Sequence, residues 1–269
     1  MKLYAISDLH LGSTENRDAL AAITPRPDDW LAIAGDVGET EEHLRFALDT
    51  LGGKFARLVW TPGNHELWSL PPGSLRGRAR YERLVELCRA HGALTPEDDY
   101  PLADFGGRTF RVVPLFTLYD YSFRPDDVPF ERAVAWAREA GVRCADEIML
   151  DPSPHPDRPS WCRERCNLTE RRLAAACVDG TPTVLINHWP LLAGLVRVPR
   201  APRFSLWCGT RRTADWPRRF RAELVISGHL HMRGTTFVEG VRYEEVSLGY
   251  PQQWRGRIAA DTLPLQVLG

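Results

Sequence analysis

Five short polar segments of the chain carry the residue types that bind metal ions and move protons. In chain order they are Asp8-Leu9-His10, Gly35-Asp36, Gly63-Asn64-His65-Glu66, Asn187-His188 and Gly228-His229-Leu230-His231. They hold five of the eight histidines, and glycine precedes Asp36, Asn64 and His229, as tight turns require. Imidazoles with hard oxygens suit Mn, Fe or Zn, and no cysteine joins them to favour a softer metal. One Asp-x-His or His-x-His pair is usually a surface feature, but five such segments together predict a shared metal site.

Each polar segment directly follows an apolar run with the length of a buried strand. Such runs predict strands at 3–7, 30–34, 58–60, 110–116, 183–186 and 224–226, and a hairpin at 235–246. Helical periodicity predicts helices at 16–23, 39–51, 74–90, 130–140 and 168–178. This alternation indicates a layered α/β sandwich with a mixed sheet. Because open α/β sheets bind ligands beyond the carboxyl ends of their strands, we expect the polar segments to converge there.

The composition indicates a single globular domain over residues 1–269. The 269 residues fit one hydrophobic core, and 43% of them are hydrophobic while 26% are charged. No apolar run approaches the length of a membrane span, and the first residues lack an export pattern. We therefore expect a cytoplasmic protein with no membrane partner.

The charged residues and cysteines narrow the chemistry further. The net charge is −1, from 34 basic and 35 acidic residues, which disfavours a nucleic-acid partner. Only Lys2 and Lys54 are lysines, which disfavours a mechanism that uses a lysine nucleophile. The six cysteines show no second pair at zinc-finger spacing, and we expect isolated thiols rather than disulfides or structural zinc.

Residues 117–166 interrupt the alternation of strands and helices. They contain aromatic residues, the helix predicted at 130–140, and prolines at positions 152, 154, 156 and 159. Because this segment is not rich in glycine or serine, it predicts a lid-like insertion rather than a linker.

The five polar segments resemble, in their order along the chain, the motifs of the calcineurin-like metallophosphoesterase family. The resemblance covers nearly the whole chain outside 117–166. It implies a four-layer αββα fold, in which a β-sandwich of mixed sheets is flanked by helices and holds two metal ions. The implied ligands of the first ion are Asp8, His10, Asp36 and His231. Those of the second are Asp36, Asn64, His188 and His229, with Asp36 bridging. Two such ions about 3.5–4 Å apart can generate hydroxide near neutral pH and clamp an in-line displacement.

His65 follows the implied ligand Asn64 without being a ligand itself. In the resembled family this histidine protonates the leaving oxygen or stabilises its charge, and an acid three residues past the bridging Asp36 often orients it. Glu39 occupies that position here, where related phosphatases often have Asp. Glu39 could equally complement the positive end of the helix predicted at 39–51. From the sequence, both interpretations of Glu39 stay open.

The arginines give the main indication of a substrate. Eight of them lie at positions 197, 200, 203, 211, 212, 218, 219 and 221. The fork of arginine suits phosphate, although a solvated face explains most of these residues at least as well. Arg211 and Arg212 follow the turn at Gly209 and are the best candidates for substrate binding. We expect segment 197–221 and the 117–166 insertion to border one pocket that selects the substrate.

The C-terminal third carries a narrower resemblance, to an actinobacterial branch of the family that includes phosphopantetheinyl hydrolases. It rests on Leu206-Trp207-Cys208-Gly209-Thr210, Thr213-Ala214-Asp215-Trp216, Gly228-His229-Leu230-His231 and Val246-Ser247-Leu248-Gly249-Tyr250-Pro251. The branch implies cleavage of a phosphodiester that joins 4′-phosphopantetheine to a serine of an acyl-carrier protein. A phosphomonoesterase acting on a small metabolite or phosphoprotein is one alternative. A non-catalytic interaction scaffold is another, which the intact ligand set disfavours.

Overall fold

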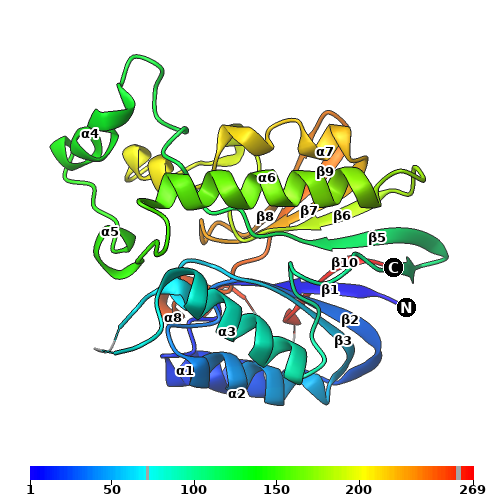
Figure 1. Ribbon diagram of the computed structural model, residues 1–269. Coiled ribbons are helices and arrows are strands. Elements are labelled where there is room, and N and C mark those ends of the chain that lie inside the picture. Colours follow the sequence, from blue (N-terminus) through cyan, green and yellow to red (C-terminus); the bar gives the residue numbers. More distant parts are fainter. Residues whose placement is uncertain (71–72, 259–261) are drawn as a thin grey trace.

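The computed structural model describes residues 1–70, 73–258 and 262–269. Two β-sheets lie face to face, and helices cover the outer face of each sheet (Figure 1). This arrangement is the αββα sandwich of mixed sheets that the family resemblance implied; the alternation of strands and helices alone indicates one mixed sheet.

The smaller sheet has the strand order β10-β1-β2-β3. Its strands are β1 (Leu3–Ile6), β2 (Arg26–Ala34), β3 (Phe55–Thr61) and β10 (Leu265–Leu268). The first three are parallel, and β10 pairs antiparallel with β1. Its outer helices are α1 (Thr14–Ala21), α2 (Glu41–Gly52) and α3 (Gly77–Ala90) (Figure 1). Because β1, β2 and β3 are parallel, their carboxyl ends lie at one edge of the sheet.

The larger sheet has the strand order β4-β5-β6-β7-β9-β8. Its strands are β4 (Leu102–Phe105), β5 (Arg108–Pro114), β6 (Thr183–Ile186), β7 (Ala222–Ser227), β8 (Gly234–Val238) and β9 (Val241–Glu245). The four inner strands are parallel, and both edge strands are antiparallel to their neighbours. Helices α6 (Arg158–Ala176) and α7 (Trp216–Arg219) cover this sheet (Figure 1), and α8 (Pro251–Trp254) follows the hairpin.

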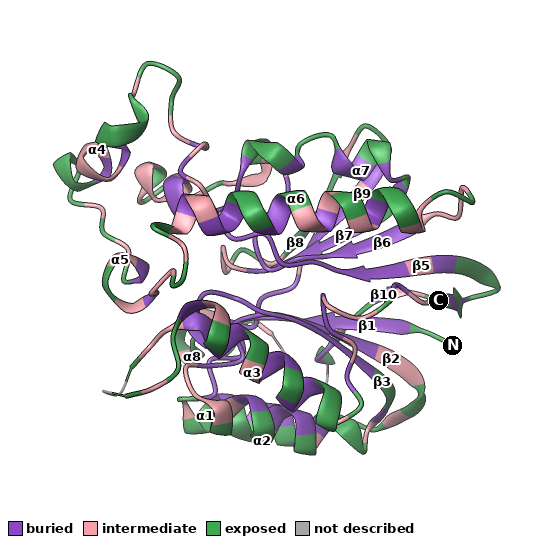
Figure 2. Ribbon diagram, viewed as in Figure 1, coloured by how far each residue is buried: buried purple, intermediate pink, exposed green. Residues whose placement is uncertain are grey.

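Both faces of the central strands are buried, which explains their continuous apolar sequence (Figure 2). In β1, Leu3 and Ala5 belong to the same core cluster as Val184 of the opposite sheet. The alternate residue Ile6 belongs to a second cluster together with Leu48 of α2. Alternate side chains of β1 therefore pack against the opposite sheet on one face and against the helices on the other.

The predicted insertion contains two short helices, α4 (Ala133–Glu139) and α5 (Asp146–Met149), which extend beyond the sandwich (Figure 1). The long helix α6 begins at Arg158, ten residues before the helix predicted at 168–178. Asp157 caps it by accepting the backbone N–H of Ser160, and Pro159 lies in its first turn. The last of the four prolines thus marks the start of a helix.

All six cysteines are free thiols, as the sequence predicted. Cys162 and Cys166 lie one turn apart on α6, with their sulfur atoms 4.0 Å apart. Within the described residues, no group of potential metal ligands includes a cysteine. No described helix is long and apolar enough to cross a membrane.

Candidate metal centre

The five polar segments meet at the carboxyl ends of β1, β2, β3, β6 and β7. Their potential ligand atoms form three overlapping groups in the described part of the chain. The groups are Asp8 with His10 and His231, His10 with Asp36 and His65, and Asp36 with His188 and His229. Because His10 and Asp36 are each shared by two groups, the atoms form one continuous site.

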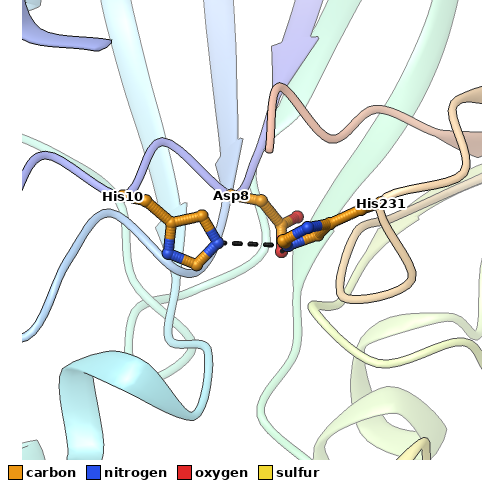
Figure 3. Close-up of side chains that lie close together, drawn as sticks. All are labelled: Asp8, His10 and His231. Carbon is orange, nitrogen blue, oxygen red and sulfur yellow. Dashed lines mark hydrogen bonds and ion pairs between the residues drawn. The ribbon is translucent and has the colours of Figure 1, made fainter. Parts of the chain in front are cut away.

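In the first group, three potential ligand atoms face one another (Figure 3). Nε2 of His231 lies 3.0 Å from Oδ1 of Asp8 and 3.1 Å from Nε2 of His10. Asp8 and His10 are buried, and His231 is partly buried. Two imidazole nitrogens that approach each other in this way suit a shared cation.

The remaining atoms of the first group are fixed by neighbouring side chains. The second oxygen of Asp8, Oδ2, accepts hydrogen bonds from Ser7 Oγ at 2.6 Å and Ser247 Oγ at 2.7 Å. Nδ1 of His231 donates a hydrogen bond to Oε1 of Gln253 at 2.7 Å. These three hydrogen bonds leave Oδ1 of Asp8 and Nε2 of His231 to face the site. Neither residue type nor spacing in the sequence predicts these roles of Ser7, Ser247 and Gln253.

The group of Asp36, His188 and His229 centres on His188. Its Nε2 atom lies 3.2 Å from Asn64 Oδ1, 3.2 Å from His229 Nδ1 and 3.5 Å from Asp36 Oδ1. Its Nδ1 atom donates to the backbone oxygen of Ala34 at 2.9 Å, so the lone pair lies on Nε2. Two nitrogens and two oxygens therefore point toward one position, as ligands of a cation do.

Charge and burial also fit metal ions. Burial alone would raise the pKa of Asp8, but the charge of His231 and its hydrogen bond hold that pKa well below the usual value. Asp8 and Asp36 are thus buried anions, and within the described ranges their ion pairs involve only histidines. Burial lowers the pKa of His10 to about 4 and that of His229 to about 3, so both rings are neutral. His231, whose pKa is raised to about 9, pairs with Asp8, and His65 and His188, whose pKa values are also raised, pair with Asp36. The buried carboxylates are therefore held beside positive charge, which metal ions can equally supply.

The backbone of the ligand loops is strained. Asp8, His10, Asp36, His229 and His231 have φ values of 53°, 42°, 52°, 73° and 52°. These lie in the left-handed region, which residues with side chains seldom adopt and which costs about 1–3 kcal/mol each. Such strain persists where the surrounding structure enforces it, and it is typical of functional sites.

The glycines of the motifs make room for ligand atoms. Gly35 has a φ of +83°, as the predicted tight turn requires. Gly63 and Gly228 have no such φ, so the turn explanation does not apply to them. Instead, a Cβ at Gly63 would lie 2.1 Å from Asp36 Oδ1, and one at Gly228 would lie 2.3 Å from Asp8 Oδ2.

His65 lies beside Asp36 and is oriented by Glu39. Its Nδ1 atom is 3.0 Å from Glu39 Oε1, and its Nε2 atom is 3.8 Å from Asp36 Oδ2. Burial would lower the pKa of His65, but the charge of Asp36 and then the bond to Glu39 raise it to about 9. Helix α2 is capped by Thr40, so Glu39 precedes the helix, and its other oxygen lies 3.3 Å from His43. These contacts favour an orienting role for Glu39 over the helix-charge interpretation.

Glu66 connects the loops that follow β2 and β3. Its carboxylate accepts the backbone N–H groups of Asp36 and Val37, both at 2.9 Å, and of Gly63 at 3.0 Å. Glu66 was visible in the motif, but its type and position alone do not reveal these three backbone partners.

Asp146 from the insertion holds Asn64 in place. Its Oδ1 atom accepts from Asn64 Nδ2 at 3.0 Å and from Trp68 Nε1 at 2.7 Å, and its Oδ2 atom accepts from Tyr119 at 3.0 Å. With Nδ2 held in this way, Oδ1 of Asn64 faces His188. No sequence signal distinguishes Asp146 from the other acidic residues of the insertion.

In the structure, the two candidate arginines, Arg211 and Arg212, lie against the insertion. Arg211 pairs with Asp126 at 2.5 Å and donates to the backbone oxygen of Arg124 at 3.0 Å. Arg212 lines a hollow of about 230 Å³ together with insertion residues such as Phe130. The arginine segment and the insertion therefore share a border, but no residue of the three potential metal-ligand groups lines this hollow.

Comparisons with known proteins agree with this geometry. A family model described as calcineurin-like phosphoesterase matches residues 1–233. [Acyl-carrier-protein] phosphodiesterase PptH of Mycobacterium tuberculosis (strain ATCC 25618 / H37Rv) is 46% identical over 260 residues, which is 95% of this chain and 80% of that protein. The crystal structure of phosphopantetheinyl hydrolase (PptH) from Mycobacterium tuberculosis aligns with a TM-score of 0.92, over 99% of this chain and 95% of that chain. A dimetal phosphatase from Danio rerio is 13% identical, with a TM-score of 0.47 over 92% of this chain and 87% of that chain.

Proposed function

The chain belongs to the calcineurin-like phosphoesterase family, and from that premise we propose that it is a two-metal phosphodiesterase which removes 4′-phosphopantetheine from a holo acyl-carrier protein. The observation that carries the chemistry is the continuous set of three overlapping ligand groups, which are joined through His10 and Asp36. The substrate is supported by the 46% identical relative, whose name gives it an acyl-carrier-protein phosphodiesterase activity.

Two divalent transition-metal ions are the cofactors of this proposal. Asp8, His10, Asp36 and His231 would hold the first ion, and Asp36, Asn64, His188 and His229 would hold the second. Histidine nitrogens mixed with hard oxygens suit Mn, Fe or Zn. When bound, the ions polarise the phosphoryl oxygens and lower the barrier for attack by water. Their charge exceeds that of Asp8 and Asp36, so the site attracts a phosphoryl anion.

His65 is the proton donor for the leaving oxygen. Glu39 engages Nδ1 at 3.0 Å, which leaves Nε2 on the side of Asp36 and the metal ligands. The hydrogen bond to Glu39 raises the pKa of His65 and so favours the protonated ring that a proton donor requires. Trp68 stacks on the ring with centroids 3.8 Å apart and limits its rotation.

The overall reaction is hydrolysis. Water attacks phosphorus and loses one proton, the bond between phosphorus and the carrier-protein serine oxygen breaks, and His65 gives a proton to that oxygen. The proton lost by water replaces the one given by His65, so the enzyme is restored. The products are 4′-phosphopantetheine and a carrier protein with a free serine hydroxyl.

The decisive experiment uses purified protein reconstituted with Mn. We expect elemental analysis to approach two ions per chain, a nitrophenyl diester to be cleaved faster than the matched monoester, and holo carrier protein to lose the mass of phosphopantetheine. Asp36→Asn should lower both metal content and activity, because the bridging charge is removed. Asp18→Asn, on the exposed surface of α1, is the matched control and should change neither.

Two results would contradict the proposal. Absence of bound metal after reconstitution with Mn, Fe or Zn would refute the two-metal site. A preference for the monoester, with holo carrier protein left intact, would instead support the phosphomonoesterase alternative.

A further inference from the structure

A cavity of about 320 Å³ lies between the β8–β9 hairpin and the loop that follows β6. Leu195 and Arg197 of the loop line one side, and Thr236, Phe237 and Tyr243 of the hairpin line the other. This volume is at the lower end of the about 300–1,000 Å³ found for small-molecule pockets. The cavity therefore suits a small molecule or one slender arm of a larger one.

The cavity adjoins the candidate metal centre. Leu230, which lines it, lies between His229 and His231 in the chain. Pro190, which also lines it, follows His188 by two residues. A molecule in this cavity is thus held beside the two loops that contribute these histidines.

A short chain of polar contacts connects the cavity wall with the first ligand group. Glu245 lines the cavity, and its Oε1 atom is hydrogen-bonded to Ser247 Oγ. The same serine oxygen lies 2.7 Å from Oδ2 of Asp8. One hydroxyl group therefore separates the cavity wall from a proposed metal ligand.

The walls combine exposed apolar side chains with separated polar groups. Met232 is 47% exposed and Phe237 is 69% exposed, and such grouped exposure of large apolar side chains is typical of a binding surface. Arg197, Thr236 and Glu245 place hydrogen-bonding groups among them. This mixture fits a chain in which methyl and methylene groups alternate with amides and a hydroxyl, which is the chemistry of pantetheine.

We propose that this cavity binds the pantetheine arm of the holo carrier protein while the phosphodiester lies at the metal centre. The inference rests on the proposed function, and it assigns recognition of the pantetheine arm to this cavity. The apolar walls bury the methyl and methylene groups of the arm, and Thr236 and Glu245 bind its amide and hydroxyl groups. A diester that lacks the pantetheine arm does not occupy this cavity.

Filling the cavity tests this inference. Gly234 and Gly194 both line it, neither has a positive φ, and an added Cβ has no neighbour closer than 3.8 Å at Gly234 and none within 4 Å at Gly194. Gly234→Phe and Gly194→Phe therefore introduce a ring at the cavity with little backbone strain. Gly52→Phe is the matched control, since Gly52 is exposed at the end of α2 and also has no neighbour within 4 Å.

We expect both cavity variants to lower kcat/KM for holo carrier protein by about tenfold or more while hydrolysis of a nitrophenyl diester stays within about twofold. The inhibition constant of 4′-phosphopantetheine against that diester should rise by a similar factor, and the inhibition constant of inorganic phosphate should not change. Gly52→Phe should behave like the wild type in all four measurements.

The outcomes distinguish the two proposals. If the wild-type enzyme leaves holo carrier protein intact, the proposed function fails, whatever the variants do. If the wild type cleaves it and both cavity variants cleave it equally well, the arm binds elsewhere and this inference is wrong. A parallel loss of both activities in the two variants would likewise overturn it, because the cavity would then not distinguish the arm from the phosphodiester.

Discussion

Gly63→Ala tests whether the candidate metal centre depends on packing closer than a side chain permits. A Cβ at this position would lie 2.1 Å from Asp36 Oδ1 and 2.5 Å from the backbone nitrogen of Asp36, whereas ordinary contacts begin at 3.4 Å. The carboxylate must therefore move by more than 1 Å, because the backbone nitrogen beside it blocks accommodation on that side. Asp36 also accepts the backbone N–H of His65 at 3.0 Å, so the displacement reaches the proposed proton donor.

The expected loss of turnover follows from this displacement. Misplacing a positioning group by about 1 Å costs roughly 100-fold in rate. Because Asp36 belongs to two ligand groups, Gly63→Ala should lower the occupancy of both metals. Gly228→Ala places its Cβ 2.3 Å from Asp8 Oδ2 and should lower mainly the occupancy of the first metal. The two variants thus separate the bridging position from a ligand of one ion.

The assay combines elemental analysis, kcat for a nitrophenyl diester and the unfolding temperature Tm. Gly52→Ala is the control, since its Cβ has no neighbour within 4 Å and Gly52 ends helix α2. Its Tm should equal or exceed that of the wild type, because alanine lowers the entropy of the unfolded chain. If Gly63→Ala keeps the wild-type metal content and a kcat within about twofold, the reasoning from close packing is refuted.

Three further predictions concern the side chains around the ligands. His65→Asn should retain both metals and lower turnover roughly 10²–10⁴-fold, less so for nitrophenolate leaving groups; an equal loss for all leaving groups would contradict a proton donor. Asp146→Ala should lower metal affinity or activity by about 10–100-fold, because it frees the amide of Asn64, whereas Asp146→Asn keeps an acceptor oxygen and should lose less; equal values for both variants and the wild type would exclude the role. Arg211→Ala and Arg212→Ala should raise KM for holo carrier protein and leave a small diester unaffected in steady-state assays; an unchanged KM would make both arginines part of a solvated face.

The strands that carry the ligands were predictable because both of their faces are buried. The strand predicted at 183–186 is β6 with the same bounds, and the hairpin at 235–246 is β8 and β9. The edge strands β4 and β10 were not predicted. Each has four residues, directly follows a proline, and exposes part of its side chains, so no apolar run distinguishes it from a loop.

The potential ligands were predictable by residue type, but their supporting groups were not. Asp8 follows β1 and His231 follows β7, which belong to different sheets, so the packing of the two sheets brings the residues together. Ser247 contacts Asp8 from 239 positions away, and Asp146 contacts Asn64 from 82 positions away. Serine and aspartate at such separations match no local pattern, and only the folded chain identifies them as partners.

Residues Val246–Pro251, which form the last motif of the narrower resemblance, contact the candidate metal centre. Ser247 holds Oδ2 of Asp8, the backbone N–H of Gly249 donates to the backbone oxygen of Asp8 at 3.0 Å, and Tyr250 stacks on His10 with ring centroids 4.2 Å apart. These residues hold Asp8 and His10, whose backbone is strained. The motif therefore supports the metal centre, and this role does not depend on the substrate. Selection of a carrier protein must then depend on other surfaces, and among the described residues the cavity lined by Leu230 combines proximity to that centre with walls suited to a pantetheine arm.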